Sequence, residues 1–160
     1  MSEKQSSKQG SPIIPELLAP AGSFEKLETA IHYGADAVYL GGSRFGLRAR
    51  AGKFDRGMIQ EAIRYSHDRG VKVYVTVNII AHNSDFEGLE SYLLFLEKSG
   101  ADGLIISDPG IFSIAATTVC TPVHLSTQAN VTNSRTAAFW AAQGAARLNL
   151  ARELSLAEIK

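Results

Sequence analysis

Short apolar runs alternate with amphipathic segments of about 10–15 residues from Ile13 onward. The intervening segments carry apolar residues at helical spacing, as in Phe24, Leu27 and Ile31. Strands that alternate with helices in this way form parallel sheets. The pattern therefore predicts an α/β fold with strands at residues 16–19, 37–40, 72–78, 103–107, 123–126 and 147–150.

One phrase recurs where each amphipathic segment meets the next apolar run. It reads GADAVYL at residues 34–40, GADGLII at 100–106 and GAARLNL at 144–150, with a looser copy at 70–75. A glycine that ends a helix at positive φ, followed at once by a buried strand, explains the repeat. The pairs Ser84 with Glu87 and Ser155 with Glu158 have capping-box spacing and predict two helix starts.

The spacing of the strands, roughly 20–35 residues, suits the βα units of a (β/α)8 TIM barrel. A doubly wound sheet is the alternative, but residues 18–23 (LAPAGS) lack its Gly-rich phosphate turn. A complete barrel takes about 250 residues. We therefore expect residues 13–160 to be the N-terminal part of a TIM-barrel-like domain with about six βα units, truncated, after a disordered tail at residues 1–12. An open six-stranded sheet is the other interpretation.

Composition restricts the class of protein further. The 160 residues balance sixteen Lys and Arg against sixteen Asp and Glu, which excludes a globally basic nucleic-acid binder. A single cysteine, Cys120, excludes a disulfide framework and a cysteine-bound metal centre, and we predict a buried structural thiol. Neither a membrane-spanning run nor a secretory signal is visible, so we expect a cytoplasmic protein.

Polar residues gather where catalytic sites of barrels lie, along the inner strand faces and at the carboxyl ends of the strands. The inner set includes Glu16, Tyr39 and His124, and a polar lumen is costly unless it serves a site or is fully hydrogen-bonded. The carboxyl-end set is Asn78, His82, Asp108, Gln128, Asn130, Arg152 and Glu153. Some of these residues also have purely structural explanations. His82 can be an exposed loop histidine, Asp108 can cap a helix, and Arg152 and Glu153 can form a local ion pair.

The segment at residues 43–56 is locally basic. It holds Arg44, Arg48, Arg50, Lys53 and Arg56 with only one acidic residue, and Phe45 and Phe54 lie among them. Arginines grip phosphates and aromatic rings stack on bases, so this segment is the best nucleic-acid signal in the chain. The alternative is a solvated loop that packs on a neighbouring segment. Zinc-protease, serine-hydrolase and P-loop motifs are absent from the sequence.

Several phrases together resemble the collagenase-like peptidases of unknown catalytic type, peptidase family U32. They are PELLAPAG (15–22), YGADAVYLGG (33–42), LRAR (47–50), SDPG (107–110), HLSTQAN (124–130) and ARELS (151–155). The resemblance implies a longer protein with a barrel-like N-terminal part and downstream cysteines for an iron–sulfur cluster, with no cofactor held by this chain. The closest likeness is to the branch implicated in wobble-uridine 5-hydroxylation of tRNA, with prephenate as a small anionic co-substrate.

Three functions follow as hypotheses: an RNA-modifying enzyme, a peptidase of undefined mechanism that binds peptides, or an inactive fragment or binding module. We take His82, Asp108 and Asn78 as candidate catalytic residues. The candidate substrate-binding residues are Glu16, Tyr39, Arg48, Arg50, His124, Gln128, Asn130, Arg152 and Glu153. No metal ligands are predicted. An incomplete barrel leaves a sheet edge exposed, so we also expect self-association and no membrane partner.

Overall fold

Six parallel strands form one sheet in the order in which they occur along the chain. The computed structural model describes residues 14–47 and 54–159, so the expected tail lies outside the described residues. The strands are β1 (Leu18–Pro20), β2 (Ala37–Gly41), β3 (Lys72–Val77), β4 (Gly103–Ile106), β5 (Val123–Leu125) and β6 (Arg147–Leu148). Each pairs in parallel with the next. The predicted α/β fold with six βα units is confirmed.

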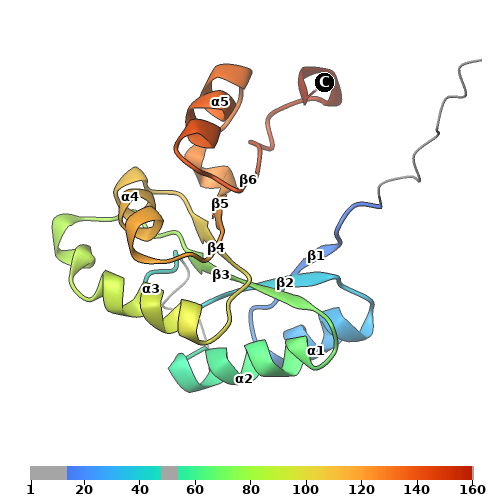
Figure 1. Cartoon of the computed structure of the whole chain (residues 1–160). Coiled ribbons are helices and arrows are strands. Elements are labelled where there is room, and N and C mark those ends of the chain that lie inside the picture. Colours follow the sequence, from blue (N-terminus) through green and yellow to red (C-terminus); the bar gives the residue numbers. More distant parts are fainter. Residues whose placement is uncertain (1–13, 48–53, 160) are drawn as a thin grey trace, which may run out of the picture.

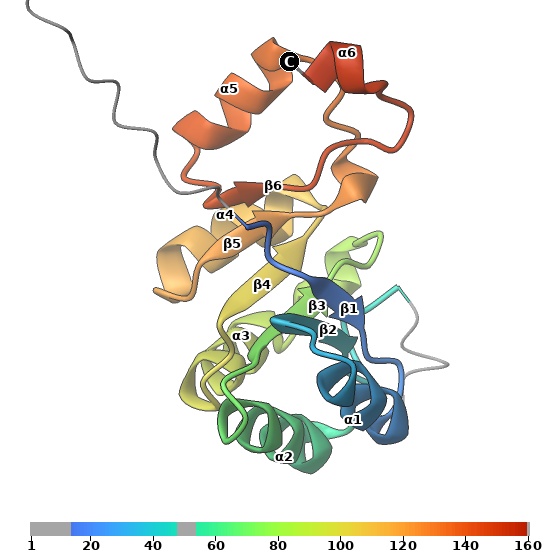
Figure 2. The ribbon, with the colours of Figure 1, turned by 90° about the vertical axis from the view of Figure 1, so that its right-hand side faces the viewer.

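Helices follow the strands and surround the outside of the curled sheet, which forms about half of a barrel (Figures 1 and 2). They are α1 (Phe24–His32), α2 (Arg56–His67), α3 (Leu89–Lys98), α4 (Pro109–Thr118), α5 (Ser134–Ala142) and α6 (Leu156–Ile159), with short 3-10 helices η1 (Asn83–Phe86) and η2 (Thr127–Ala129). None of the helices in residues 14–47 and 54–159 has the length and apolar character that a bilayer crossing requires.

The two faces of the sheet have different surroundings. Val73, Val75 and Val77 of β3 are fully buried in the core between the sheet and the helices. Tyr74, on the opposite face of β3, belongs to a smaller apolar cluster with Ala37 and Ile105 inside the curve of the sheet. Alternation of side chains along a strand produces this division. The inner face is therefore where side chains from different strands meet.

The glycines of the recurring phrase end helices as the sequence predicts. Gly34, Gly70, Gly100 and Gly144 have φ of 86°, 72°, 87° and 96°. This left-handed region is open to glycine at little cost and turns the chain directly into the next strand.

The aspartate of the same phrase ties adjacent strands together. Asp36 Oδ2 accepts a hydrogen bond from the backbone of Leu17 at 2.7 Å, and Asp102 Oδ2 accepts from the backbone of Val73 at 2.7 Å. Each aspartate precedes one strand and bonds the start of the strand before it. The two copies that carry the aspartate therefore fix strand register as well as a helix end.

One predicted helix start is right and one is wrong. The backbone N–H of Ser155 donates to Glu158 Oε2 at 2.8 Å, which is the reach-back half of a capping box at the start of α6, and the Ser155 hydroxyl donates to the same oxygen. The pair Ser84 and Glu87 starts no helix, because α3 begins later, after Gly88 at φ 74°. The reach-back bond in this loop runs instead from the backbone of His82 to the Asp85 carboxylate, at 2.8 Å.

Candidate functional site

The carboxyl edge, where the strands end, carries a cluster of hydrogen-bonded amides. Asn78 follows β3, and Gln128 lies in η2 after β5. Asn78 Nδ2 donates to Gln128 Oε1, and Ser126 Oγ lies 3.2 Å from the same oxygen. The backbone of Leu47 donates to Asn78 Oδ1 at 3.1 Å. These three side chains, Asn78, Ser126 and Gln128, are called the amide cluster below.

Beside the amide cluster lies a hollow of about 290 Å³. It is lined by Thr127, Gln128, Asn130, Arg152 and Glu153. A backbone hydrogen bond of 3.0 Å from Ala151 to Val131 joins the segment after β6 to the segment after η2 and brings these residues together. The lining offers a guanidinium, two amides and a carboxylate, so it suits a polar ligand with oxygen acceptors and one or more donors.

His82 and Asp108, expected at the same edge, have structural contacts of their own. His82 is exposed and caps η1 through its backbone. Asp108 Oδ1 accepts from the backbone of Ile111 at 2.9 Å and caps α4, with Pro109 at the first position. Helix capping therefore accounts for the position of Asp108, which leaves a chemical role for either residue as a proposal.

Glu16, Tyr39 and His124 lie on the inner face of the sheet, as the alternation predicts. Glu16 precedes β1, which begins two residues later than the sequence indicates. It lies at the amino ends of the strands, opposite to the hollow, because its partners are Lys72 at the start of β3 and Arg147 at the start of β6. The structure therefore does not bring Glu16 to the carboxyl edge.

Four side chains form an ionic cluster at this amino end: Glu16, Lys72, Tyr74 and Arg147. The Glu16 carboxylate accepts from Arg147 at 2.7 Å, from Tyr74 Oη at 2.9 and 3.0 Å, and from Lys72 at 3.3 Å. The hydrogen bond from Arg147 is the largest cause that lowers the pKa of Glu16, to about 2. The carboxylate therefore stays charged at physiological pH.

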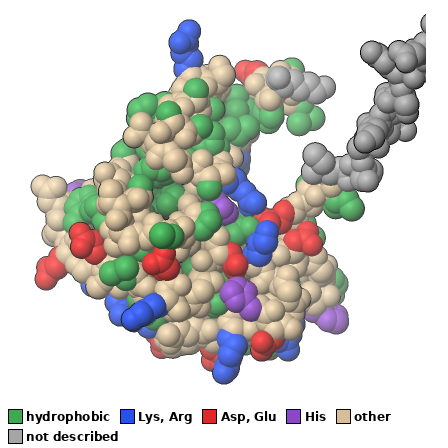
Figure 3. Space-filling model, viewed as in Figure 1, with side chains coloured by type: hydrophobic (Ala, Val, Ile, Leu, Met, Phe, Trp, Pro, Cys, Tyr) green, Lys and Arg blue, Asp and Glu red, His purple; other side chains and the backbone are tan. Residues whose placement is uncertain are grey.

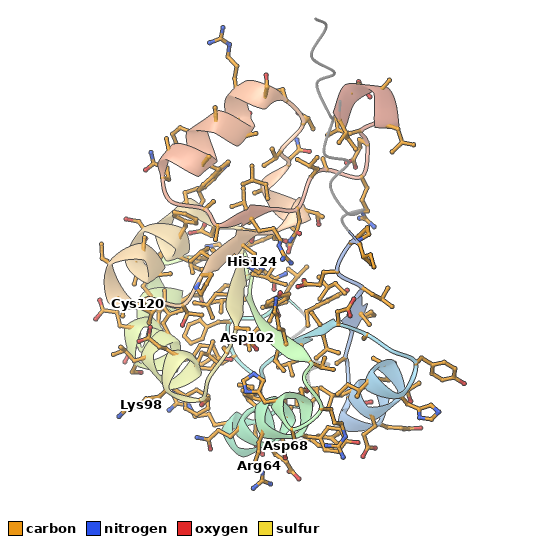
Figure 4. The ribbon with its side chains drawn as sticks, turned by 45° about the vertical axis from the view of Figure 1, so that its right-hand side comes forward. Arg64, Asp68, Lys98, Asp102, Cys120 and His124 are labelled. Atoms are coloured by element: carbon orange, nitrogen blue, oxygen red, sulfur yellow. The ribbon has the colours of Figure 1, made fainter. Side chains whose placement is uncertain are left out.

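His124 packs on this ionic cluster from the middle of the sheet (Figure 4). Its ring lies edge-on to Tyr74 with centroids 4.6 Å apart. Gly103 makes room for both rings, since a Cβ there would lie 2.9 Å from His124 Cε1 and 3.1 Å from Tyr74. Burial lowers the pKa of His124, and the Arg147 charge adds to this effect. Burial therefore disfavours the charged form of His124, and Gly103 permits its packing against Tyr74.

The structure describes only part of the basic segment at residues 43–56. Arg44 donates to the backbone carbonyl of Glu87 at 2.7 Å, and Arg56 lies 4.8 Å from the ring of Phe95. Phe45 and Phe54 are buried, at 3% and 1% exposure, so the expectation that they stack on bases is wrong. Both belong to the main core, where the ring of Phe45 lies 5.1 Å from that of Tyr92 on α3. Arg48, Arg50 and Lys53 lie outside the described residues.

Sequence reasoning missed Lys72 and Arg147 as members of the inner face. Both were visible by alternation, because Lys72 lies two residues before Tyr74 and Arg147 two before Asn149. Both residues lie in copies of the recurring phrase, but their common partner Glu16 is far away in sequence. Their place in the cluster depends on contact between segments that are far apart in the sequence, and no local sequence pattern reveals such a contact.

The residues described do not fit an iron–sulfur cluster. Such clusters take several cysteine thiolates, and Cys120 is the single cysteine of the sequence. Cys120 is exposed on the outer helical layer, away from His124, so the prediction of a buried thiol is wrong (Figure 4). Across residues 14–47 and 54–159 no group of three His, Cys, Asp or Glu side chains is arranged to hold a metal ion.

Comparison with known proteins adds family and fold. The sequence profile of the family described as Peptidase family U32 matches residues 22–160. The chain is 46% identical to the tRNA hydroxylation protein P1 of Bacillus subtilis, covering 91% of this chain and 35% of that protein. It is 42% identical to an uncharacterized protease of Methanocaldococcus jannaschii, covering 92% of this chain and 36% of that protein. The chain thus spans about a third of the length of these relatives.

A solved structure described as a U32 peptidase shares the fold. It superposes with a TM-score of 0.71 at 19% identity, and the match covers 92% of this chain and 62% of the other. At this identity the likeness concerns the arrangement of strands and helices, and it agrees with the half-barrel of parallel strands seen here.

Proposed function

We propose, from the premise that this chain belongs to peptidase family U32, that it is part of an RNA-hydroxylating protein. The observation that carries the proposal is the 46% identity to a tRNA hydroxylation protein over 91% of the chain. The polar hollow at the carboxyl edge supports it, because enzymes with barrel folds place their sites there. The proposed activity is that of the whole protein, because this chain spans only about a third of the length of its relatives.

The proposed substrate is a tRNA with a wobble uridine as the hydroxylated base, and the proposed co-substrate is a small anion such as prephenate. Arg152 supplies the positive charge that an anion requires, and Gln128, Asn130 and Glu153 supply hydrogen-bonding groups around it. We assign phosphate contacts to Arg48 and Arg50. The proposed site also includes Tyr39, on the inner face of the sheet, and His82, at the carboxyl edge. A protein that acts on tRNA works in the cytoplasm, which is the proposed location.

Salt dependence of binding tests this proposal on the full-length protein. Binding of tRNA is measured by fluorescence anisotropy between 50 and 200 mM salt. Each phosphate contact contributes about 0.9 to the slope of log affinity against log salt, so Arg48→Gln, which removes one of the proposed phosphate contacts, is expected to lower the slope by about one. Arg135→Gln, on exposed α5, is the matched control. Undetectable or salt-independent binding would contradict the proposal.

Hydroxylation itself is tested in cells. Replacing the native gene with the Arg152→Gln variant is expected to reduce hydroxylated uridine in bulk tRNA, read by mass spectrometry of nucleosides. The Arg135→Gln strain is expected to retain the modification. Hydroxylated uridine that is lost from both strains, or that stays at the wild-type level in both, would remove Arg152 from the site. An iron–sulfur cluster belongs to this proposal only in the longer form, because one cysteine cannot hold it.

A peptidase is the second candidate, favoured by the 42% identity to a protein described as an uncharacterized protease. Cleavage of gelatin by the full-length protein tests it, with His82→Asn and Asp108→Asn as variants. Asparagine caps a helix as well as aspartate does, so Asp108→Asn keeps α4 while removing the charge. Loss of cleavage in either variant supports a peptidase, whereas cleavage that survives both removes these residues from it. A chain that binds without turnover is the remaining, non-enzymatic outcome.

A further inference from the structure

The backbone fixes which way the Asn78 amide faces. Leu47 N–H donates to the side chain of Asn78 at 3.1 Å, and a backbone N–H has no acceptor capacity. The Asn78 atom that faces Leu47 must therefore be the oxygen, Oδ1. The NH₂ group, Nδ2, is then the atom that faces Gln128. One unambiguous donor thus assigns both ends of this amide.

The same reasoning carries over to Gln128. Asn78 Nδ2 only donates, so Gln128 must present its oxygen, Oε1, to it. Ser126 Oγ lies 3.2 Å from the same oxygen and supplies a second donor. Ser126 is buried, with 5% exposure, which holds this arrangement in place. The Gln128 NH₂ group, Nε2, therefore faces away from the amide cluster, and among the described residues it has no acceptor within hydrogen-bond distance.

Gln128 also lines the hollow, together with Arg152 and Asn130. We infer that Gln128 Nε2 donates a hydrogen bond to an oxygen acceptor of the ligand, and that Asn78 is the positioning residue that sets this polarity. The acceptor is a nucleobase carbonyl or an anionic oxygen, which share this chemistry. The inference rests on the proposed function only in taking the hollow as the place where the ligand binds.

A single substitution is expected to reverse the polarity without touching the ligand. In Asn78→Asp the carboxylate still accepts from Leu47 but has no proton to donate to Gln128. The Gln128 amide then gains by turning its Nε2 toward position 78, which leaves Oε1 at the hollow. Gln128 Oε1 and the acceptor oxygen of the ligand then face each other, and the ligand loses the hydrogen bond that Gln128 Nε2 donates.

The experiment follows the Gln128 side-chain amide by NMR in the 160-residue chain labelled with ¹⁵N-glutamine. Its resonances are identified by their loss in Gln128→Glu. The probes are uridine, which offers carbonyl oxygens without charge, and inorganic phosphate, which offers anionic oxygens. We expect at least one probe to shift the Gln128 resonances, and Asn78→Asp to weaken that probe by about tenfold, the effect of one lost hydrogen bond.

Asn83→Asp is the matched control, since it adds the same charge to the same loop on an exposed residue of η1. It is expected to leave uridine binding unchanged. If Asn78→Asp does not fold, Gln128→Glu replaces it, with binding read by calorimetry and the same tenfold loss expected. A Gln128 amide that responds to neither probe overturns the inference, and so does equal binding by wild type and Asn78→Asp.

The outcome is separable from that of the proposed function. If the probes shift Gln128 in an Asn78-dependent way while the full-length protein does not bind tRNA, this inference holds and the RNA proposal fails. A response to uridine alone assigns the acceptor to a base carbonyl, and a response to phosphate alone assigns it to an anion. Either response supports a donor at Gln128.

Discussion

Glu16 is a residue whose pKa is strongly lowered by folding. Four hydrogen bonds, led by the one from Arg147, lower the pKa of its carboxyl from 4.5 to about 2 despite partial burial. A carboxyl with a depressed folded pKa stabilises the native state above its unfolded pKa. That stabilisation is lost as the pH falls from about 4.5 toward 2.

Replacing this carboxylate is therefore expected to matter at neutral pH and not in acid. Glu16→Gln is expected to lower the free energy of unfolding by about 1–2 kcal/mol at pH 7, less than the full pKa shift implies because Arg147 is partly exposed. The difference from wild type is expected to shrink between pH 4.5 and 2, measured by urea denaturation at each pH. Glu61→Gln, exposed on α2, is the control. A difference that stays constant with pH contradicts the assignment.

Single residues were predictable where their environment is set locally. The alternation along β3 placed Tyr74 and Asn78 on the inner face, and positive φ at Gly34 followed from its place at a helix end. The partners of Glu16 were not predictable, because Arg147 lies 131 residues away and only the curl of the sheet brings it near. The same applies to the contact of Asn78 with Gln128, 50 residues apart.

At the scale of elements, the aspartate of the recurring phrase joins neighbouring strands. Asp102→Ala removes the acceptor for the Val73 backbone and for His67 Nε2, both bonded to Oδ2 at 2.7 and 2.8 Å. We expect a loss of about 1–3 kcal/mol in unfolding free energy, because a buried N–H is left without a partner.

Hydrogen exchange at the Val73 amide locates the effect of Asp102→Ala. This amide is expected to exchange faster, while amides in the middle of α4 change only by the global loss of stability. Asp68→Ala, just after α2, changes the same charge without a described strand contact and is expected to leave Val73 protected. Equal protection of Val73 in wild type and Asp102→Ala would show that the carboxylate does not hold β3.

The elements themselves were largely predictable from the sequence. Each strand begins within two residues of its expected position, since buried strands between C-terminal helix glycines leave a strong local pattern. β1 and β6 are shorter than expected, and β6 ends two residues early, at Leu148. The start of α3 was missed because η1 intervenes, with His82 and Asp85 forming the reach-back bond that the sequence indicated two residues later, between Ser84 and Glu87.

At the scale of the whole molecule, one group of exposed apolar side chains lies on the last two helices. Phe139 on α5 is 57% exposed, and Leu156 and Ile159 on α6 are 81% and 51% exposed. Figure 3 shows hydrophobic side chains gathered over the part of the molecule that holds α5. Together with the open strand β6, such a surface favours association between molecules.

We therefore expect the 160-residue chain to form oligomers whose mass rises with concentration, measured by light scattering after size exclusion. Leu156→Glu is expected to shift the population toward monomer, because it places a charge in the apolar surface. Leu94→Glu, on α3 and 46% exposed, is the control and is expected to leave the mass distribution unchanged. A monodisperse monomer at all concentrations contradicts this expectation.

The order of the strands also sets the order in which the chain can fold during synthesis. Each strand pairs with the one just before it, so the sheet can grow by one βα unit at a time as the chain leaves the ribosome. The contact between Glu16 and Arg147 is the exception, because it waits for the sixth strand. Until then the carboxylate of Glu16 has only Lys72 and Tyr74 as partners. The ion pair between Glu16 and Arg147 is thus a late event in biogenesis, formed only once the sheet has curled far enough for these two side chains to come within hydrogen-bond distance.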